Sequence, residues 1–263
     1  MLIDTHTHID IISSDKTEQD RIVERAVLND VGLMINVGVE PPTMPAVRDV
    51  AVRHDCVRYS SGIQPEFINE PGVPPVLDID LSAIEKDLSD PRCVACGEIG
   101  LDYYHNQQNA RDQITLFIRQ IDLAVRLGKP VLIHSRDAWE DTLSVMKLYK
   151  GRLKGIFHCF SGGVEEARGC LDLGFFISFA GNLTYPTAGK LREAAAYIPA
   201  ERTFLETDAP YLTPVPQRGK RNEPAFVAHT YAFYSELKKT AVEEVSLIHH
   251  KGINDLFPGI LQP

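Results

Sequence analysis

The sequence has no apolar run that approaches the ~18 residues needed to span a bilayer. Asp4 interrupts the apolar start at Leu2 and Ile3, and no basic segment precedes it, so we expect no secretory signal peptide. Basic residues are also few, since 27 Lys and Arg stand against 36 Asp and Glu, a formal net charge of −9. This balance argues against a protein held on DNA by a broad basic surface. It still allows enzymatic contact with phosphates, because bound divalent ions would add positive charge locally.

Cysteine is scarce and odd in number, which argues against a framework of disulfide bonds. The five cysteines are scattered through apolar segments, at Cys56, Cys93, Cys96, Cys159 and Cys170. Reduced, buried thiols of this kind are typical of a cytoplasmic protein, which is the location we expect. The pair Cys93 and Cys96 also suggests a zinc or redox motif, but its odd spacing on a predicted strand would send the two thiols to opposite faces.

What the sequence does contain is a regular alternation of apolar strands and amphipathic helices. The predicted strands cover residues 2–8, 31–37, 57–63, 93–98, 131–134, 155–158, 175–179 and 203–208. Eight strand–helix repeats in 263 residues, 44% of them hydrophobic, match the ~250 residues of a closed (β/α)8 TIM barrel, an α/β fold. We therefore expect one domain over residues 1–263, with a doubly wound open sheet as the alternative.

Two histidines follow the first buried residues of the chain. His6 and His8 are two positions apart, so on a strand they point the same way with Cα atoms about 6.6 Å apart. Two imidazoles at this spacing can converge on one metal ion, to which histidine nitrogens bind at about 2.0–2.1 Å. Taken alone, the pair is equally consistent with two surface histidines at a strand end.

More residues of metal-ligating type end other predicted strands, and in a TIM barrel these ends form the catalytic face. With the first pair, they make a set of His6, His8, Glu98, His134, His158 and Asp208. Packing alone does not explain so many imidazoles and carboxylates at one level, because each costs free energy when it is buried without a partner. The nitrogen-rich set suits Zn, Mn, Co or Ni better than Ca.

Long blocks around these residues resemble the TatD family, whose members are described as divalent-metal-dependent deoxyribonucleases related to the amidohydrolase superfamily. The resemblance rests on residues 2–10 (LIDTHTHID), 130–138 (PVLIHSRDA) and 205–211 (LETDAPY), with further matches at 97–104 (GEIGLDYY), 158–162 (HCFSG) and 218–224 (RGKRNEP). These blocks occur in the same order and with the same spacing over essentially the whole chain. The family identification therefore does not depend on any single motif.

The resemblance implies a site with two divalent ions, drawn from Zn, Mn, Mg, Co or Ni. His6, His8 and Asp208 would bind the first ion, and Glu98 would bridge it to a second ion held by His134 and His158. Metal coordination would make a water nucleophilic near neutral pH. Asp208 would take its proton, so Asp208 and Glu98 are the expected catalytic residues.

Candidate substrate contacts lie beside these strand ends. Arg136 either meets a phosphate or pairs with Asp137 or Glu140. The cations of the loop after the last strand, Arg218, Lys220 and Arg221, either steer phosphates or simply form a solvated charged loop.

Three further features have two interpretations each or lie away from the site. Tyr103 and Tyr104 either stack on a base or fill the barrel mouth. Glu206 either orients a ligand or is a buried, hydrogen-bonded carboxylate. His249 and His250 lie on a C-terminal helix and are expected at the surface.

One block departs from the family pattern. The family usually has Gly-x-His-Pro-His after the third strand, where this chain has Gly62-Ile63-Gln64-Pro65-Glu66. None of the six proposed ligands is affected, but Glu66 would repel a polyanion. We therefore expect metal binding to persist and the preference for DNA to be weaker or altered.

The leading functional hypothesis is a metal-dependent phosphodiesterase that degrades DNA from single-stranded 3′ ends. Hydrolysis of an amide or ester, such as an aminoacyl ester on tRNA, is the second, and a catalytically silent metal-binding protein is the third. The expected partner is DNA or another phosphodiester, with no membrane and no obligate protein partner.

Overall fold

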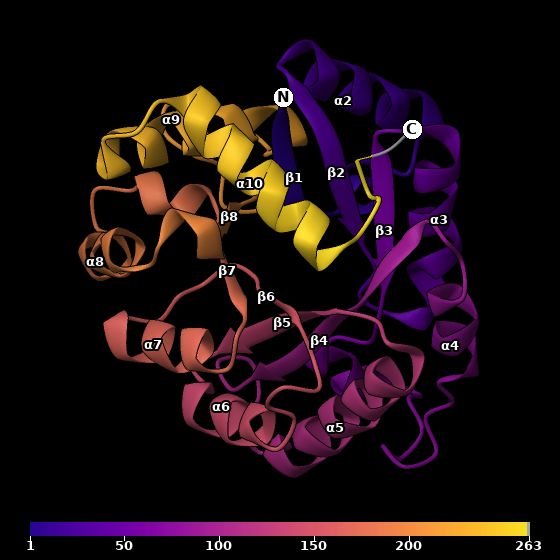
Figure 1. Cartoon of the computed structure of the whole chain (residues 1–263). Helices are drawn as coiled ribbons and strands as arrows, with labels where there is room; N and C mark the ends of the chain where they lie inside the picture. The colour runs from indigo at the N-terminus through magenta and orange to yellow at the C-terminus, as the bar shows by residue number, and fades with distance from the viewer. Residues whose placement is uncertain (262–263) are drawn as a thin grey trace.

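The computed structural model describes residues 1–261, and it is a parallel eight-stranded barrel in which each strand pairs with the next along the chain, from β1 to β8 (Figure 1). The strands are β1 (Leu2–Thr7), β2 (Val31–Val37), β3 (Val57–Ser61), β4 (Cys93–Asp102), β5 (Val131–Arg136), β6 (Gly155–Phe157), β7 (Phe176–Phe179) and β8 (Thr203–Leu205). A parallel bridge between Thr7 and Ala209, just after β8, brings the last strand back to the first. The predicted TIM barrel is confirmed, and the open-sheet alternative is wrong.

Helices surround the barrel because each carries one apolar face that packs on the outer side of the sheet. They are α1 (Ile9–Ile12), α2 (Lys16–Leu28), α3 (Met44–Arg53), α4 (Ser82–Leu88), α5 (Ala110–Leu127), α6 (Trp139–Lys147), α7 (Val164–Asp172), α8 (Gly189–Tyr197), α9 (Val227–Lys238) and α10 (Val242–Leu256). The longest, α5, ends at Gly128, whose φ of 65° is the left-handed conformation that glycine adopts at helix ends. Among residues 1–261, no helix is both long and apolar enough to cross a membrane.

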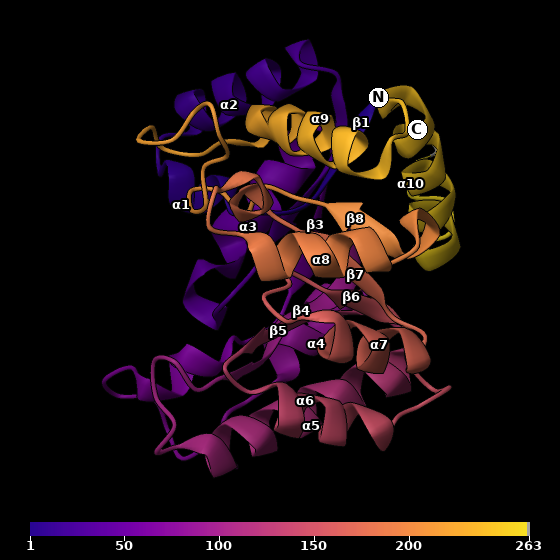
Figure 2. The ribbon, with the colours of Figure 1, turned by 90° about the vertical axis from the view of Figure 1, so that its left-hand side faces the viewer.

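The two ends of the barrel differ (Figure 2). At the end where the strands begin, α10 lies across the opening and packs Ile253 and Leu256 against the apolar interior, including Ile3 and Leu33. The loops that follow the strands gather at the opposite end. The barrel is therefore closed by apolar side chains at one end, and polar chemistry is confined to the other.

The ends of β4 and β8 differ most from their predicted positions. β4 continues to Asp102, with a register shift between Cys96 and Ile99, so Glu98 lies within the strand and not at its end. β8 stops at Leu205, so Asp208 lies three residues beyond it. A bulge re-aims a side chain without ending a strand, which is why Glu98 still reaches the catalytic face.

The surface location expected for His249 is wrong, whereas His250 is partly exposed. His249 is buried on the face of α10 that meets the barrel, where its Nδ1 lies 2.9 Å from the hydroxyl of Tyr231 on α9. The same hydroxyl accepts a hydrogen bond from the Ile3 backbone N–H at 3.3 Å. Two adjacent histidines therefore have opposite environments, because α10 presents one face to the barrel and the other to water.

Candidate metal centre

Two histidines and an aspartate meet where β1 lies beside the end of β8. His6 is the penultimate residue of β1, and His8 follows the strand directly. Their Nε2 atoms are 3.2 Å apart, and Asp208 Oδ1 lies 3.8 Å from His6 Nε2 and 3.5 Å from His8 Nε2. The predicted convergence of the two imidazoles is therefore present, and Asp208 lies beside them.

A second group comes from β4, β5 and the residue that follows β6. Glu98 Oε1 lies 2.9 Å from His134 Nδ1 and 3.1 Å from His158 Nε2. These two ring nitrogens are 3.2 Å apart. The His158 ring also stacks on His6, with ring centroids 3.8 Å apart, so the two groups are in contact.

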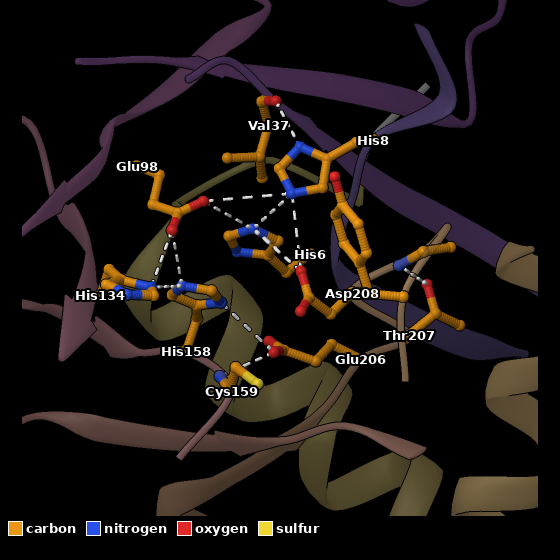
Figure 3. Close-up of polar contacts among 12 residues, drawn as sticks. His6, His8, Val37, Glu98, His134, His158, Cys159, Glu206, Thr207 and Asp208 are labelled. Atoms are coloured by element: carbon orange, nitrogen blue, oxygen red, sulfur yellow. Dashed lines mark hydrogen bonds and ion pairs between the residues drawn. The ribbon is translucent and has the colours of Figure 1, made fainter. Parts of the chain in front are cut away.

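Glu98 lies between the two groups, as Figure 3 shows. Its Oε1 faces His134 and His158, while its Oε2 lies 3.3 Å from His6 Nε2 and 4.0 Å from His8 Nε2. The structure thus brings together all of the residues predicted as ligands, and one carboxylate faces both groups.

Local backbone structure holds these side chains in place. Asp208 has a φ of 53°, a left-handed conformation that Asp tolerates better than most residues, and its N–H donates to the His6 carbonyl at 2.9 Å. Gly100 lets β4 approach β5 closely, because a Cβ there would be 1.9 Å from the His134 carbonyl oxygen. The buried Asp4 carboxylate accepts hydrogen bonds from the N–H and hydroxyl of Thr207 at 2.9 and 2.6 Å. These contacts join β1 to the segment that carries Asp208.

The carboxylates of the centre are held ionised by their neighbours. Burial alone would raise the pKa of Glu98, but the imidazoles of His158, His134 and His6 outweigh it and hold the pKa well below its usual value. Burial alone would also raise the pKa of Asp208, but the hydrogen bond from His8 and the charges of the neighbouring imidazoles outweigh it, so the pKa is lowered. Both side chains are therefore anionic at neutral pH.

The pKa values of three imidazoles in the centre are raised. Burial would lower the pKa of His8 and His134, but hydrogen bonds to Asp208 in the first case and to Asp102 and Glu98 in the second raise each pKa to about 9. The pKa of His158 is raised well above its usual value, because Glu98 and Glu206 outweigh burial.

The donor set fits divalent metal ions on geometric grounds. A carbonyl oxygen can only accept, so His8 Nδ1 donates its proton to the Val37 carbonyl 2.9 Å away. In neutral His8 the Nε2 atom therefore has no proton and carries a lone pair. That lone pair faces His6 Nε2 and the oxygens of Asp208 and Glu98, a cluster of acceptors that a cation stabilises. Two separate sets each have ligand atoms within 4.8 Å of one another, namely His6, His8 and Asp208 on one side and Glu98, His134 and His158 on the other.

Residues that the sequence interpretation missed support these ligands from behind. Asp102 Oδ2 lies 2.9 Å from His134 Nε2, the ring nitrogen that does not face Glu98. Asp102 is an even number of residues from Glu98, and on an extended strand this spacing places both side chains on the same face. This spacing could have indicated Asp102 from the sequence. The Val37 carbonyl likewise accepts a hydrogen bond from the ring nitrogen of His8 that faces away from the centre. No sequence pattern identifies a backbone acceptor of this kind.

Glu206 combines its two predicted interpretations. It is fully buried, and its Oε1 accepts a hydrogen bond from the Cys159 N–H at 2.7 Å. The same oxygen lies 3.5 Å from His158 Nδ1. Glu206 is thus a buried, hydrogen-bonded carboxylate that also lies behind His158.

A third, more open group borders the centre. His105 Nδ1 lies 3.1 Å from Glu66 Oε1 and 3.1 Å from Asp102 Oδ2. Through Asp102 this group reaches His134. Glu66, the residue found where the family usually has histidine, is therefore paired with an imidazole from another loop.

The predicted substrate contacts form two arginine–tyrosine stacks. The guanidinium of Arg136 lies 3.8 Å from the ring centroid of Tyr104, which is 62% exposed. The guanidinium of Arg218 lies 4.0 Å from the ring centroid of Tyr185. Among residues 1–261, Arg136 makes no ion pair with Asp137 or Glu140, so that alternative is wrong.

Other predicted contacts are engaged within the protein. Tyr103 donates to Asp141 at 2.7 Å and so belongs to the packing around α6. Lys220 donates to the Gln217 side chain at 2.7 Å, and Arg221 donates to the Ile11 carbonyl at 2.7 Å. Arg221 therefore ties its loop to α1, whereas Lys220 remains exposed beside the site.

Comparison with known proteins identifies the family. The family model of TatD related DNases matches residues 3–258. The chain is 36% identical over 259 residues to the metal-dependent hydrolase YcfH of Escherichia coli K12, covering 97% of this chain and 95% of that protein. It is 35% identical over 221 residues to the 3′-5′ ssDNA/RNA exonuclease TatD of Klebsiella pneumoniae, covering 82% of each.

The fold agrees with these matches. The crystal structure of the TatD homologue YjjV of E. coli K12 superposes with a TM-score of 0.89 at 28% identity, covering 97% of each chain. The closed barrel, the cluster of imidazoles and carboxylates at its mouth and the match over nearly the whole sequence all agree. The chain belongs to the TatD family of metal-dependent hydrolases.

Proposed function

We propose that this protein is a phosphodiesterase that degrades DNA from the 3′ end with the help of two divalent metal ions. The observation that carries the proposal is the position of Glu98, whose two oxygens face two separate groups of imidazole nitrogens. A carboxylate that faces both groups would hold two ions close together, and a close pair of ions stabilises the attacking and leaving oxygens of an in-line displacement at phosphorus. The exonuclease name of the K. pneumoniae relative supports the choice of substrate and direction.

The proposal assigns the ligands as follows. His6, His8 and Asp208 would hold one ion and His134 and His158 the other, with Glu98 placed between the two groups. When bound, the ions supply Lewis acidity toward the phosphodiester and lower the pKa of a water to near neutrality.

Asp208 acts as the general base. Its lowered pKa keeps the carboxylate ionised at neutral pH, so it can accept a proton from the attacking water and pass it to the leaving oxygen. Its left-handed backbone conformation directs the carboxylate toward His6 and His8. The carboxylate therefore lies next to the nitrogens that would hold one of the ions.

Outer carboxylates keep the imidazoles in their binding orientation. Asp102 faces the back of His134, and Glu206 faces the back of His158. Carboxylates in this position fix the ring orientation and raise the basicity of the ligating nitrogen. They are positioning residues and do not contact the substrate.

The two arginine–tyrosine stacks suit a nucleotide substrate. Each offers a cation for a phosphate and an aromatic face on which a base can stack. Arg136 is the last residue of β5, and its partner Tyr104 lies in the loop after β4. Arg218 and Tyr185 belong to the loops after β8 and β7. Phosphates can therefore be held near the ions although the chain as a whole is acidic.

The test is release of nucleotides from an end-labelled single-stranded oligonucleotide by protein that is first chelated and then reloaded with Mg²⁺, Mn²⁺ or Zn²⁺. We expect stepwise shortening of 5′-labelled strands only after metal is restored. No shortening with any metal would overturn the proposal.

One observation favours a second candidate. Glu66 is 39% exposed, and it places a carboxylate near the path of a polyanion. The bond cleaved in an aminoacyl ester at the end of a tRNA is itself uncharged, so Glu66 would oppose it less than it opposes an anionic phosphodiester at the same place. Turnover of such esters without turnover of oligonucleotides would replace the first proposal with this one.

A further inference from the structure

We infer that Glu66, Asp102 and His105 form a third divalent-cation site at the edge of the metal centre. Each side chain offers one ligand atom, and these atoms lie within 4.8 Å of one another. The role given below to the bound cation rests on the proposed phosphodiesterase function, whereas the binding itself does not.

The geometry of the group suits an octahedral ion. His105 Nδ1 lies 3.1 Å from an oxygen of each carboxylate. Ligands about 2.1 Å from an octahedral ion stand about 3.0 Å from their nearest neighbours, so the two measured distances match neighbouring ligand positions.

The carboxylates differ in their surroundings, and both differences favour a bound cation. Asp102 is buried, and its Oδ1 is fixed by the His105 N–H at 2.9 Å. Glu66 is 39% and His105 41% exposed, so water can fill the remaining coordination positions. Mg²⁺ and Mn²⁺ bind in this way, through a few protein ligands and several waters.

A protonated His105 is the competing explanation. An imidazolium would also bridge the two carboxylates at 3.1 Å, but it supplies one positive charge against two negative charges. A divalent cation coordinated by neutral His105 balances both carboxylates. The two explanations differ in how much metal the protein binds.

The position of the group suggests what the cation does. Asp102 lies 2.9 Å from His134, so the site is one imidazole ring away from the group around Glu98. Alone, Glu66 repels a polyanion, whereas a divalent ion with open coordination positions attracts a phosphate. The cation thus reverses the local charge and provides a contact for a phosphate next to the one that is cleaved.

This arrangement also accounts for the departure of the loop after β3. Gln64 and Glu66 stand where the family usually has imidazoles, and His105 in the loop after β4 brings an imidazole back to Glu66. A site of mixed carboxylate and imidazole ligands thus lies beside a loop that would otherwise only repel the substrate.

The experiment counts Mn²⁺. Chelated wild-type protein, Glu66→Gln and His105→Asn are titrated with Mn²⁺, and the free ion is followed by electron paramagnetic resonance. Glu70→Gln is the control, because it removes the same charge from an exposed position in the same loop. We expect each of the two site variants to bind about one Mn²⁺ per chain fewer than the wild type, and the control to match the wild type.

A second readout tests the role. With an oligonucleotide at saturating Mn²⁺, KM should rise about tenfold in Glu66→Gln while kcat stays close to that of the wild type. Equal Mn²⁺ counts in wild type and both site variants would overturn the third site, whatever the nuclease assay shows. A lower count in the variants together with no hydrolysis by any form would uphold the site and refute the proposed function.

Discussion

The barrel buries histidines at both of its ends, with opposite electrostatic results. At the end where the strands finish, His8 and His134 face carboxylates, and the pKa of each is raised to about 9. At the end covered by α10, His249 lies against Tyr231 and Phe204, and burial followed by the charge of His250 lowers its pKa to about 3. Among residues 1–261, no carboxylate forms a hydrogen bond or ion pair with His249.

The comparison shows that burial of a histidine does not by itself make a functional site. A buried imidazole without a carboxylate stays neutral and acts as a packing residue with one hydrogen bond. A buried imidazole with carboxylates belongs to a pocket of charge that can exchange protons for metal ions. Substitutions that remove the carboxylates, or the isolated imidazole, test this distinction.

The largest effect is expected when Asp208 loses its charge. Asp208→Asn keeps the size of the side chain but cannot accept a proton, so nuclease activity should fall by about 10²–10⁴-fold. The assay is the rate of nucleotide release at saturating metal, with the circular dichroism spectrum as a check on folding. Asp112→Asn, at an exposed position of α5, is the control and should retain full activity. Retention of more than a few per cent of the wild-type rate would refute the role of Asp208 as the base.

The next largest effect is expected at the carboxylate shared by both groups. Glu98→Gln replaces an anion that faces His134, His158 and His6 with a neutral amide, a much weaker metal ligand. Metal affinity, measured by isothermal titration calorimetry, should fall by at least ~10-fold. Glu140→Gln, exposed at the start of α6, should leave the affinity unchanged. Unchanged affinity in Glu98→Gln would show that the carboxylate does not bridge.

The smallest effect is expected at the isolated histidine. His249→Asn should cost about 1 kcal/mol at neutral pH, because it disturbs one buried hydrogen bond. The folded pKa of about 3 lies below the unfolded value of 6.5, so the unfolded chain binds the extra proton between these values. The stability that neutral His249 contributes is therefore present above pH 6.5 and is lost as the pH falls toward 3.

The measurement is urea unfolding of chelated protein from pH 7 to pH 4. The stability difference between wild type and His249→Asn should shrink as the pH falls, and parallel curves would contradict the assigned environment. His250→Asn is the matched control, because this neighbour is partly exposed and, within residues 1–261, its side chain hydrogen-bonds the Met1 carbonyl alone. For His8 and His134 we expect stability to depend on pH in the opposite direction in chelated protein. Their folded pKa of about 9 lies above the unfolded 6.5, so the stability that they contribute is present below pH 6.5 and is lost as the pH rises through 9.

The accuracy of prediction varied with the range of the interaction. The apolar strands and the residues that follow them were predictable, because periodicity depends on neighbours along the chain. The bulge in β4 was not, because it depends on how β4 pairs with β5, and it placed Glu98 within a strand. The environments of His249 and His250 could not be predicted from the sequence either, because they depend on which face of α10 meets the barrel.

The sequence by itself determined the order of strands and helices, the family and the residues with the chemistry to bind metal. Only the tertiary structure decided that one carboxylate faces two groups of imidazoles, that Asp102 lies behind His134 and that His105 meets Glu66. The reason is physical: the type of a side chain and its place in a local repeat are written along the chain. Which side chains meet across the mouth depends on the closure, bulges and loops of the barrel, and these arise from contacts between residues far apart in sequence.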